Sequence, residues 1–296
     1  MFKKPWKITE GFILGGVLVL AGLFLQSLIG PIDREDFLNP PFQYILAALF
    51  PVAVLAAFLL KKRVAFFRWL GSPDSAVASI AWTMILTIVM GLTAQVPSRG
   101  WLGKMVTFRP FVFCYAWLTF VVGLVALNHI RRLGRSWKEV PAILNHLGLF
   151  IVLLCATLGS VDKRVLEMTL NEGETVSEAV AEDGTTYDTN LYVRLDDFTM
   201  ETWPSGMPKR FASDVVVRDR TGKEMAGVIE VNKPLKVDGW RIYQYGYDEE
   251  AGVKGTTSIL QFVKDPWLPY VMAGIFMMLA GAFLMMVTGF KKEEEA

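Results

Sequence analysis

Residues 145–160 read NHLGLFIVLLCATLGS, and this stretch decides the fold. It is apolar enough to cross a bilayer, yet it opens with a histidine. Apolar segments dominate the chain before it, whereas about a hundred polar, strand-like residues and one last apolar segment follow it. An imidazole inside a lipid-spanning segment is energetically costly. His146 is therefore the first candidate for a functional residue.

The composition is typical of a membrane protein. The chain has 296 residues, of which 53% are hydrophobic, and its mean hydropathy is +0.38. The net charge of +1 gives no indication of a nucleic-acid partner. The two cysteines form no CxxC, CxxCH or Cys/His zinc spacing, so neither covalent c-type haem attachment nor a zinc site is expected. A basic start and a long apolar run without a cleavage site predict a retained N-terminal helix.

Six segments are long and apolar enough to span a bilayer, which takes roughly 20 apolar residues. Pro51 lies inside the second of them and is expected to kink it. The sequence therefore predicts an α-helical bundle of six transmembrane helices. The segments are residues 8–29, 44–60, 76–94, 110–128, 141–160 and 266–290.

Lysine and arginine residues in the short loops predict the orientation in the membrane. Thirteen of them lie on one side and four on the other. The thirteen are Lys3, Lys4, Lys7, Lys61, Lys62, Arg63, Arg68, Arg131, Arg132, Arg135, Lys138, Lys291 and Lys292, and the four are Arg34, Arg99, Lys104 and Arg109. This distribution predicts that both termini are cytoplasmic and that residues 161–265 lie outside the cytoplasm.

Residues 161–265 predict one exported all-β domain, inserted between the fifth and sixth helices. Polar and apolar residues alternate over 164–170 and 191–195, as they do in half-buried strands. Residues 214–231 predict a hairpin closed at Gly222. Further strands are expected at 240–247 and 256–263. We expect an antiparallel, sandwich-like or barrel-like domain.

Five aromatic residues of this domain have two interpretations. They can form part of its core, or they can form a docking face for a partner. The core interpretation is favoured, because aromatic side chains on strands usually pack inward. The residues are Trp203, Trp240, Tyr243, Tyr245 and Tyr247.

Several short motifs, in a fixed order along the chain, resemble the ResB family of system II cytochrome c biogenesis, also called CcsB or Ccs1. They are GLTAQVP at 91–97, ALN at 126–128 followed by Arg131 and Arg132, HLGL at 146–149, VNKPL at 231–235, GWRIYQYGY at 239–247 and KDPW at 264–267. The order of three helices, a β domain and a helix also resembles that family.

The resemblance implies a domain organisation. Residues 1–70 hold two additional N-terminal transmembrane helices, which have no counterpart in the minimal family pattern. Residues 71–160 hold the ResB-like third to fifth helices, and residues 161–265 form the exported β domain. Residues 266–296 hold the sixth helix and a cytoplasmic tail. The protein is then expected to be a multi-pass protein of the bacterial cytoplasmic (inner) membrane, with its β domain periplasmic.

The resemblance also implies a function. The chain would be a non-autonomous subunit of a cytochrome c haem lyase (synthase) that exports and holds haem b transiently. It would present the haem for covalent attachment to the CxxCH motif of apocytochrome c outside the membrane. No catalytic residue of the chain itself is expected, since the cofactor supplies the reactivity and the polypeptide binds and orients it.

The partners follow from the same resemblance. This chain has no tryptophan-rich WWD-type segment for handling haem. In the family that segment belongs to a membrane partner called ResC or CcsA, which is therefore the expected partner together with apocytochrome c and thiol-reducing membrane or periplasmic proteins. A different class of function stays open: a structural or regulatory membrane subunit with a ResB-like fold that binds no haem and scaffolds a respiratory or thiol-redox complex.

Two histidines are the candidate metal ligands. His146 matches the position of a haem-ligating transmembrane histidine in the family, which implies an axial bond to haem iron. Its alternative is a hydrogen bond to a neighbouring helix or a lipid headgroup. His129 flanks the same cytoplasmic loop, so a bis-histidine haem is geometrically possible. The adjoining Arg131 and Arg132 instead indicate an interfacial residue, with the second iron ligand supplied by the partner.

Two further sets of residues have both a functional and a structural interpretation. Cys114 and Cys155 lie at similar depth near the outer face, where they could form a redox pair for apocytochrome thiols, or simply be small buried hydrophobic residues. Arg99, Lys104 and Arg109 lie between the third and fourth helices. They could bind haem propionates through charge-assisted hydrogen bonds or anchor the protein at headgroups.

Overall fold

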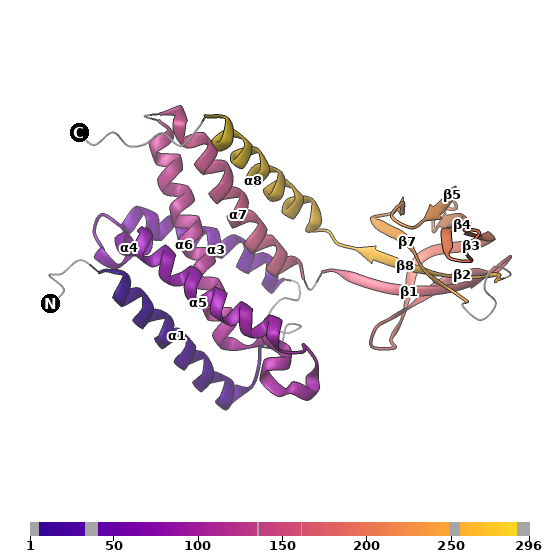
Figure 1. The fold of residues 1–296 in the computed structure, drawn as a ribbon, viewed down its shortest axis with the longest axis horizontal. Coiled ribbons are helices and arrows are strands. Elements are labelled where there is room, and N and C mark those ends of the chain that lie inside the picture. Colours follow the sequence, from indigo (N-terminus) through magenta and orange to yellow (C-terminus); the bar gives the residue numbers. More distant parts are fainter. Residues whose placement is uncertain (1–5, 33–40, 135, 161, 249–254, 289–296) are drawn as a thin grey trace. The chain divides into compact units, whose positions relative to one another are not determined.

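The computed structural model describes residues 6–32, 41–134, 136–160, 162–248 and 255–288. The chain divides into two compact units (Figure 1). The helical unit is Met1–Val161 with Trp267–Ala296, and the β unit is Asp162–Pro266. Several residues used for the orientation lie outside the described residues, as does the C-terminal tail. They are Lys3, Lys4, Arg34, Arg135, Lys291 and Lys292.

In the described part of the chain, the helical unit contains six helices that are long and apolar enough to cross a membrane. The predicted multi-pass membrane protein is therefore confirmed. Pro51 lies inside the second of these helices, which continues on both sides of it. The six are α1 (Ile8–Ile29), α3 (Phe42–Leu60), α5 (Pro73–Leu92), α6 (Arg109–Leu133), α7 (Val140–Gly159) and α8 (Leu268–Thr288).

Within the described residues, three short helices connect the long ones. They are α4 (Ala65–Leu70), η1 (Pro97–Thr107) and η2 (Trp137–Glu139), and none of them was expected from the sequence. Each is too short for a hydrophobic periodicity to stand out from its surroundings. η2 matters most for the site, because it joins the end of α6 to the beginning of α7.

Helix α6 packs against α1, α3, α5 and α7. Its buried side chains include Trp117, Val121 and Leu124, which belong to one apolar cluster with residues of the neighbouring helices. α8 packs along α7, where Gly148 and Gly274 let the two backbones approach closely. These contacts fix the rotation of α7 and so the direction in which its histidine points.

The β unit is one eight-stranded antiparallel sheet in the order β5-β4-β3-β2-β1-β8-β7-β6. Its end strands approach one another, since a Cβ on Gly227 of β5 would lie 2.8 Å from Cδ1 of Leu235 on β6. Of the two expected antiparallel arrangements, the barrel-like one is confirmed and the sandwich-like one is not. The strands are β1 (Arg164–Asn171), β2 (Thr175–Ala181), β3 (Thr186–Thr202), β4 (Pro208–Asp219), β5 (Glu224–Glu230), β6 (Leu235–Val237), β7 (Trp240–Tyr247) and β8 (Thr257–Lys264).

The aromatic residues of the β unit divide between core and surface. Trp240 is buried in the core, and Tyr247 packs against it. Trp203 and Tyr245 are 52% and 59% exposed, so the core interpretation is wrong for these two. Because Trp240 and Ile242 are buried, strict alternation already places Tyr245 on the outer face. The register shift between Gln244 and Gly246 reverses the alternation after it and turns Tyr247 toward the core.

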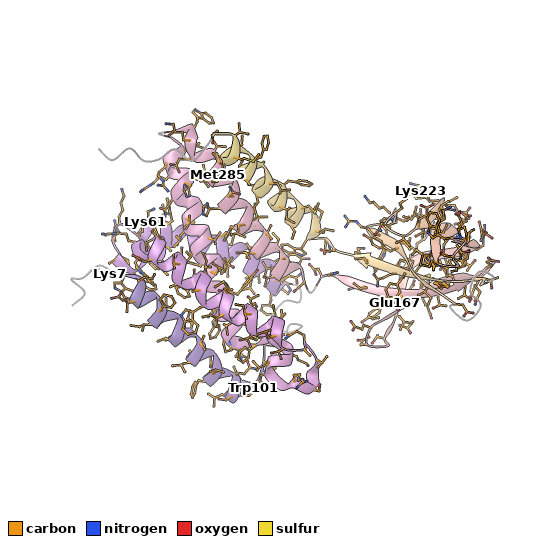
Figure 2. All side chains as sticks on the ribbon, in the orientation of Figure 1. Lys7, Lys61, Trp101, Glu167, Lys223 and Met285 are labelled. Atoms are coloured by element: carbon orange, nitrogen blue, oxygen red, sulfur yellow. The ribbon has the colours of Figure 1, made fainter. Side chains whose placement is uncertain are left out.

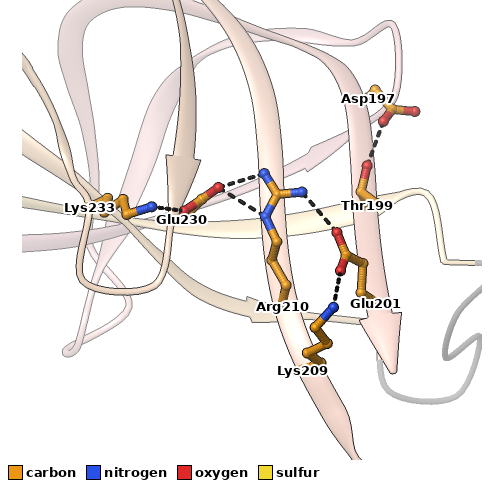
Figure 3. A network of polar contacts seen from close by, with 7 residues as sticks. All are labelled: Asp197, Thr199, Glu201, Lys209, Arg210, Glu230 and Lys233. Atoms are coloured by element: carbon orange, nitrogen blue, oxygen red, sulfur yellow. Dashed lines mark hydrogen bonds and ion pairs between the residues drawn. The ribbon is translucent and has the colours of Figure 1, made fainter. Parts of the chain in front are cut away.

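An ionic network crosses β3, β4 and the end of β5 (Figure 3). Arg210 donates to Glu201 Oε1 at 3.1 Å and to Glu230 Oε1 at 2.5 Å. Lys233 donates to Glu230 Oε2 at 2.6 Å, and Lys209 donates to Glu201 Oε2 at 3.2 Å. Hydrogen bonds from Lys233 and then Arg210 lower the pKa of Glu230. The network therefore ties together three strands at the surface of the β unit.

Candidate functional site

His146 projects from α7 about 9 Å beyond the first residue of that helix. Its ring is half-buried, and Nδ1 lies 2.8 Å from the carbonyl oxygen of Ala142. A carbonyl can only accept, so Nδ1 carries the proton and Nε2 of the neutral ring keeps its lone pair. Within the described residues Nε2 has no hydrogen-bond partner. Histidines that bind metals commonly donate their other N–H to a carbonyl or carboxylate in this way.

His129 lies in the last turns of α6 and is held by a carboxylate. Its Nδ1 is 2.6 Å from Oε2 of Glu139, the last residue of η2. Because the carboxylate accepts, this contact places the proton of the neutral ring on Nδ1. Arg132 approaches both of these side chains. Its Nε lies 3.5 Å from Glu139 Oε2, and its Nη2 lies 3.2 Å from His129 Nδ1. These contacts hold the end of α6 to the beginning of α7.

The two imidazole rings are stacked on one another. Their centroids lie 5.0 Å apart, with an angle of 24° between the ring planes. Two axial ligands of one iron must point nitrogen lone pairs at each other from opposite sides of the porphyrin, whereas stacked rings face each other with their π surfaces. The structure therefore brings the predicted pair together but does not arrange it for bis-histidine ligation.

Cationic side chains gather beside the histidine pair. The Lys61 ammonium donates to Asn128 Oδ1 and lies 3.7 Å from the centroid of the Phe58 ring. Asn128 in turn donates to the carbonyl of Gly71 at 3.3 Å. Burial, followed by the charges of Arg131 and Arg132, lowers the pKa of Lys61 to about 8. Like charges therefore crowd this end of the helical unit.

Arg99, Lys104 and Arg109 lie at the other end of the helical unit. Arg109 Nε donates to the carbonyl of Gly30 at 2.7 Å and so closes the end of α1. Arg99 and Lys104 are exposed on η1. Arg109 precedes His129 by 20 residues on α6, which is about 30 Å along the helix. The three residues are thus remote from His146, and a role in binding propionates stays a prediction for the opposite membrane face.

Figure 2 makes the two ends of the helical unit visible. Lys7, Lys61 and Met285 lie toward one end, and Trp101 of η1 lies toward the opposite end. Asn145, the neighbour of His146 in the sequence, contacts Met285 through an amide N to Sδ distance of 3.5 Å. The histidine pair therefore belongs to the Lys61 end.

Cys114 and Cys155 are both free thiols. Cys114 is completely buried, in a cluster with Leu86, Met105 and Phe108. Cys155 is partly exposed. The structure holds no disulfide between them, and a redox role stays a prediction.

Comparison with known proteins supplies a family for part of the chain. Residues 135–261 match the ResB-like family. The resemblance to ResB/CcsB proteins predicted from the sequence is thereby confirmed. The matched segment contains Glu139, α7 with His146, and most of the β unit, whereas His129 and α6 precede it.

Relatives that match part of this chain carry names from cytochrome c biogenesis. "Cytochrome c biogenesis protein CcsB" of Synechococcus sp. (strain RCC307) is 33% identical over 107 residues, which is 36% of this chain and 24% of that protein. "Cytochrome c biogenesis protein ResB" of Bacillus subtilis (strain 168) is 31% identical over 146 residues, covering 39% and 26%. The matched part of this chain thus spans about a quarter of the length of these relatives.

A solved structure, "Cytochrome c Heme Lyase CcmF", resembles 91% of this chain and 49% of that chain. Its TM-score is 0.37 at 15% identity, a likeness too low to bear on function.

Two residues of the helical unit that make structural contacts were missed by reasoning from the sequence. Glu139 is the one carboxylate between His129 and His146 in the sequence, and that position could have identified it as their partner. The two amide hydrogens of Gln95 are shared among the carbonyls of Met90, Thr93 and Leu102, and its amide oxygen accepts from the N–H of Met105. These bonds order the segment between α5 and α6.

Proposed function

We propose that the protein acts in cytochrome c biogenesis as a membrane subunit that holds haem for delivery to apocytochrome c. The observation that carries the proposal is the imidazole of His146, whose Nδ1 is bound to a backbone carbonyl while Nε2 keeps a lone pair. This donor lies inside the ResB-like segment. A neutral imidazole nitrogen with a fixed orientation fits an axial position on haem iron.

In this proposal the chain contributes binding and orientation. His146 holds the haem iron as the cargo enters from the cytoplasmic side. Haem supplies the vinyl groups to which the thiols of an apocytochrome CxxCH motif are joined. A ResC/CcsA-type partner provides the tryptophan-rich segment that this chain lacks, and a second iron ligand. The β unit lies outside the cytoplasm and both termini lie inside, as the lysine and arginine distribution predicts.

The haem proposal is tested by absorption spectroscopy. We expect the full chain, purified in detergent with its membrane partner, to show a Soret band that His146→Ala removes or displaces. Leu154→Ala, on the same helix, is the matched control and should leave the band unchanged. Equal elution of both variants on size exclusion establishes that they are folded. The same Soret band in the wild type and in His146→Ala would contradict the proposal.

The sidedness is tested by labelling introduced cysteines in intact cells with a membrane-impermeant maleimide. We expect Lys223→Cys, on the β unit, to be labelled, and Lys62→Cys, after α3, to be labelled only after lysis. The opposite pattern would reverse the orientation.

A second candidate function has its own observation. His129 contacts Glu139, and its ring stacks on that of His146, so the pair can join α6 to α7 without any ligand. A structural or regulatory subunit would then retain the fold and bind no haem. Under this alternative, neither the wild type nor His146→Ala shows a haem band. His146→Ala then unfolds at a lower denaturant concentration than the wild type.

A further inference from the structure

Three cationic side chains lie near the histidine pair, where α6 meets the end of α3. They are Lys61, Arg131 and Arg132. Asn128, Arg131 and Arg132 are spaced i, i+3 and i+4 on α6 and therefore follow one face of that helix. Lys61, which follows the last residue of α3, is tied to Asn128. Arg132 touches His129, and the ring of His129 stacks on that of His146. The cations are thus linked to His146 by a short chain of side-chain contacts.

This cluster carries more positive charge than its protein partners balance. Glu139 is the carboxylate that contacts it within the described part of the chain, and Glu139 is shared between Arg132 and His129. Arg131 has no hydrogen bond or ion pair to a described residue. Lys61 bends over the Phe58 ring toward an amide oxygen and does not extend into water. An anion bound here would relieve the repulsion among the three cations.

We propose that Lys61, Arg131 and Arg132 bind the two carboxylates of the porphyrin whose iron is held by His146. This inference rests on the proposed haem function. A porphyrin is an apolar disc with both carboxylates on one edge, so in a membrane that edge turns toward the headgroups. His146 lies about 9 Å beyond the start of its helix, and the cations lie at the adjacent membrane boundary. Ammonium and guanidinium groups form charge-assisted hydrogen bonds with carboxylates.

The positions of the other cations favour this site. Arg109 is about 30 Å from His129 along α6, and its guanidinium is already bound to the end of α1. The geometry therefore assigns the carboxylate edge of a haem on His146 to the Lys61 end of the unit. An alternative source of the same anionic chemistry is a phospholipid headgroup, which the experiment distinguishes.

The test compares two porphyrins on the full chain with its membrane partner, reconstituted in nanodiscs. Ferric haem and its dimethyl ester share the ring and the iron, but only the first carries carboxylates. We expect the wild type to bind the diacid at least about tenfold more tightly than the ester, because each charge-assisted bond contributes on that order. The combined variant Lys61→Gln, Arg131→Gln and Arg132→Gln should abolish this preference.

A control variant matches the change in charge at the same membrane face. Lys62→Gln, Arg63→Gln and Lys138→Gln together remove three charges outside the cluster and should retain the preference. If both combined variants lose the preference equally, general electrostatics explains it and the assignment is overturned. Should the first variant fail to fold, the single variant Arg131→Gln tests the same claim, since this side chain makes no contact that holds the fold.

The remaining outcomes separate this inference from the proposed function. If the wild type binds diacid and ester equally, and His146→Ala removes the Soret shift of both, the carboxylate site is wrong and the haem function stands. If neither porphyrin binds the wild type, both the carboxylate site and the proposed haem function are wrong.

The lipid outcomes distinguish porphyrin from headgroup. If the preference exists only in nanodiscs of zwitterionic lipid and anionic lipid abolishes it, lipid phosphate and porphyrin carboxylate compete for the cluster, which supports the site. If the variant changes retention of anionic lipid but not the diacid preference, the cations bind headgroups and the inference is overturned.

Discussion

The close approach of α7 and α8 at Gly148 predicts a large effect of a very small substitution. A Cβ at this position would lie 2.6 Å from the carbonyl oxygen of Gly274 and 3.0 Å from Cγ of Met278. The first of these atoms belongs to the backbone, so the methyl group fits only if α8 shifts. Overpacking of this kind costs about 1–3 kcal/mol of the free energy of unfolding. Gly148→Ala is therefore expected to destabilise the helical unit by that amount.

A glycine in open space provides the matched control. Gly91 near the end of α5 has no atom within 4 Å of the place where a Cβ would be. Gly91→Ala is expected to leave the stability unchanged or to raise it by up to about 1 kcal/mol, because alanine is the better helix former. Equilibrium unfolding in mixed detergent micelles, followed by tryptophan fluorescence, gives the free energy for both variants.

The same substitution also bears on the site, because α7 carries His146. A shift of α8 would disturb the contact between Asn145 and Met285, one residue from the proposed ligand. We expect Gly148→Ala to broaden or displace any haem band that the wild type shows. Equal stability of Gly148→Ala and Gly91→Ala would refute the packing argument.

Three more substitutions have defined expectations. Gln95→Leu leaves the buried N–H of Met105 without its acceptor, and should cost about 1–3 kcal/mol of the free energy of unfolding and speed proteolysis of the adjoining segment. Tyr115→Phe removes a 2.8 Å hydrogen bond from α6 to α7 and should cost about 1 kcal/mol in the same micelle assay. The lowered pKa of Glu230 means that its contribution to stability is present above the ordinary carboxyl pKa and is lost as pH falls through the lowered value. Glu230→Gln should therefore lower the melting temperature of the β unit at pH 7 and reduce the loss of stability on acidification, both followed by circular dichroism; an unchanged pH dependence would contradict this.

The membrane helices were predictable because their signal is local. Length and apolar composition identify a spanning segment without any knowledge of its neighbours, and the observed ends lie within a few residues of the predicted ones. Strands that bury alternate residues could likewise be predicted, from the alternation of polar and apolar residues in the sequence. β2 was missed because Ala179 is its one fully buried residue, which leaves little alternation to detect. β6 has only three residues.

The position of the two histidines near one membrane face could be predicted from the sequence, but their hydrogen bonds could not. The spacing of His129 and His146 around one loop places them near the same membrane face, and the structure brings their rings into contact. Which atom of each ring is bound depends on how α6 and α7 are rotated about their axes. That rotation is set by packing between distant segments, such as Gly148 against Gly274. The bond from His146 to Ala142 and the contact with Glu139 therefore required the structure.

The bulge in β7 illustrates the same limit for the β unit. Strict alternation from Trp240 would place Tyr247 on the outer face, yet Tyr247 packs on the core. The register shift after Gln244 reverses the alternation and turns Tyr247 inward, whereas Tyr245 keeps the exposed position that strict alternation predicts. A bulge depends on pairing with β8, so the strand's own sequence does not determine it.

The central claim is that Nε2 of His146 is the nitrogen of this chain that binds haem iron. The chain has two histidines, so His129→Gln leaves a single one to label. The most direct measurement is electron–nuclear double resonance on the ferric haem complex of this variant, with ¹⁵N-histidine in this chain and an unlabelled membrane partner. We expect a ¹⁵N coupling typical of a directly bound imidazole, which a further His146→Gln substitution abolishes. A haem-loaded sample that shows no ¹⁵N coupling would contradict it.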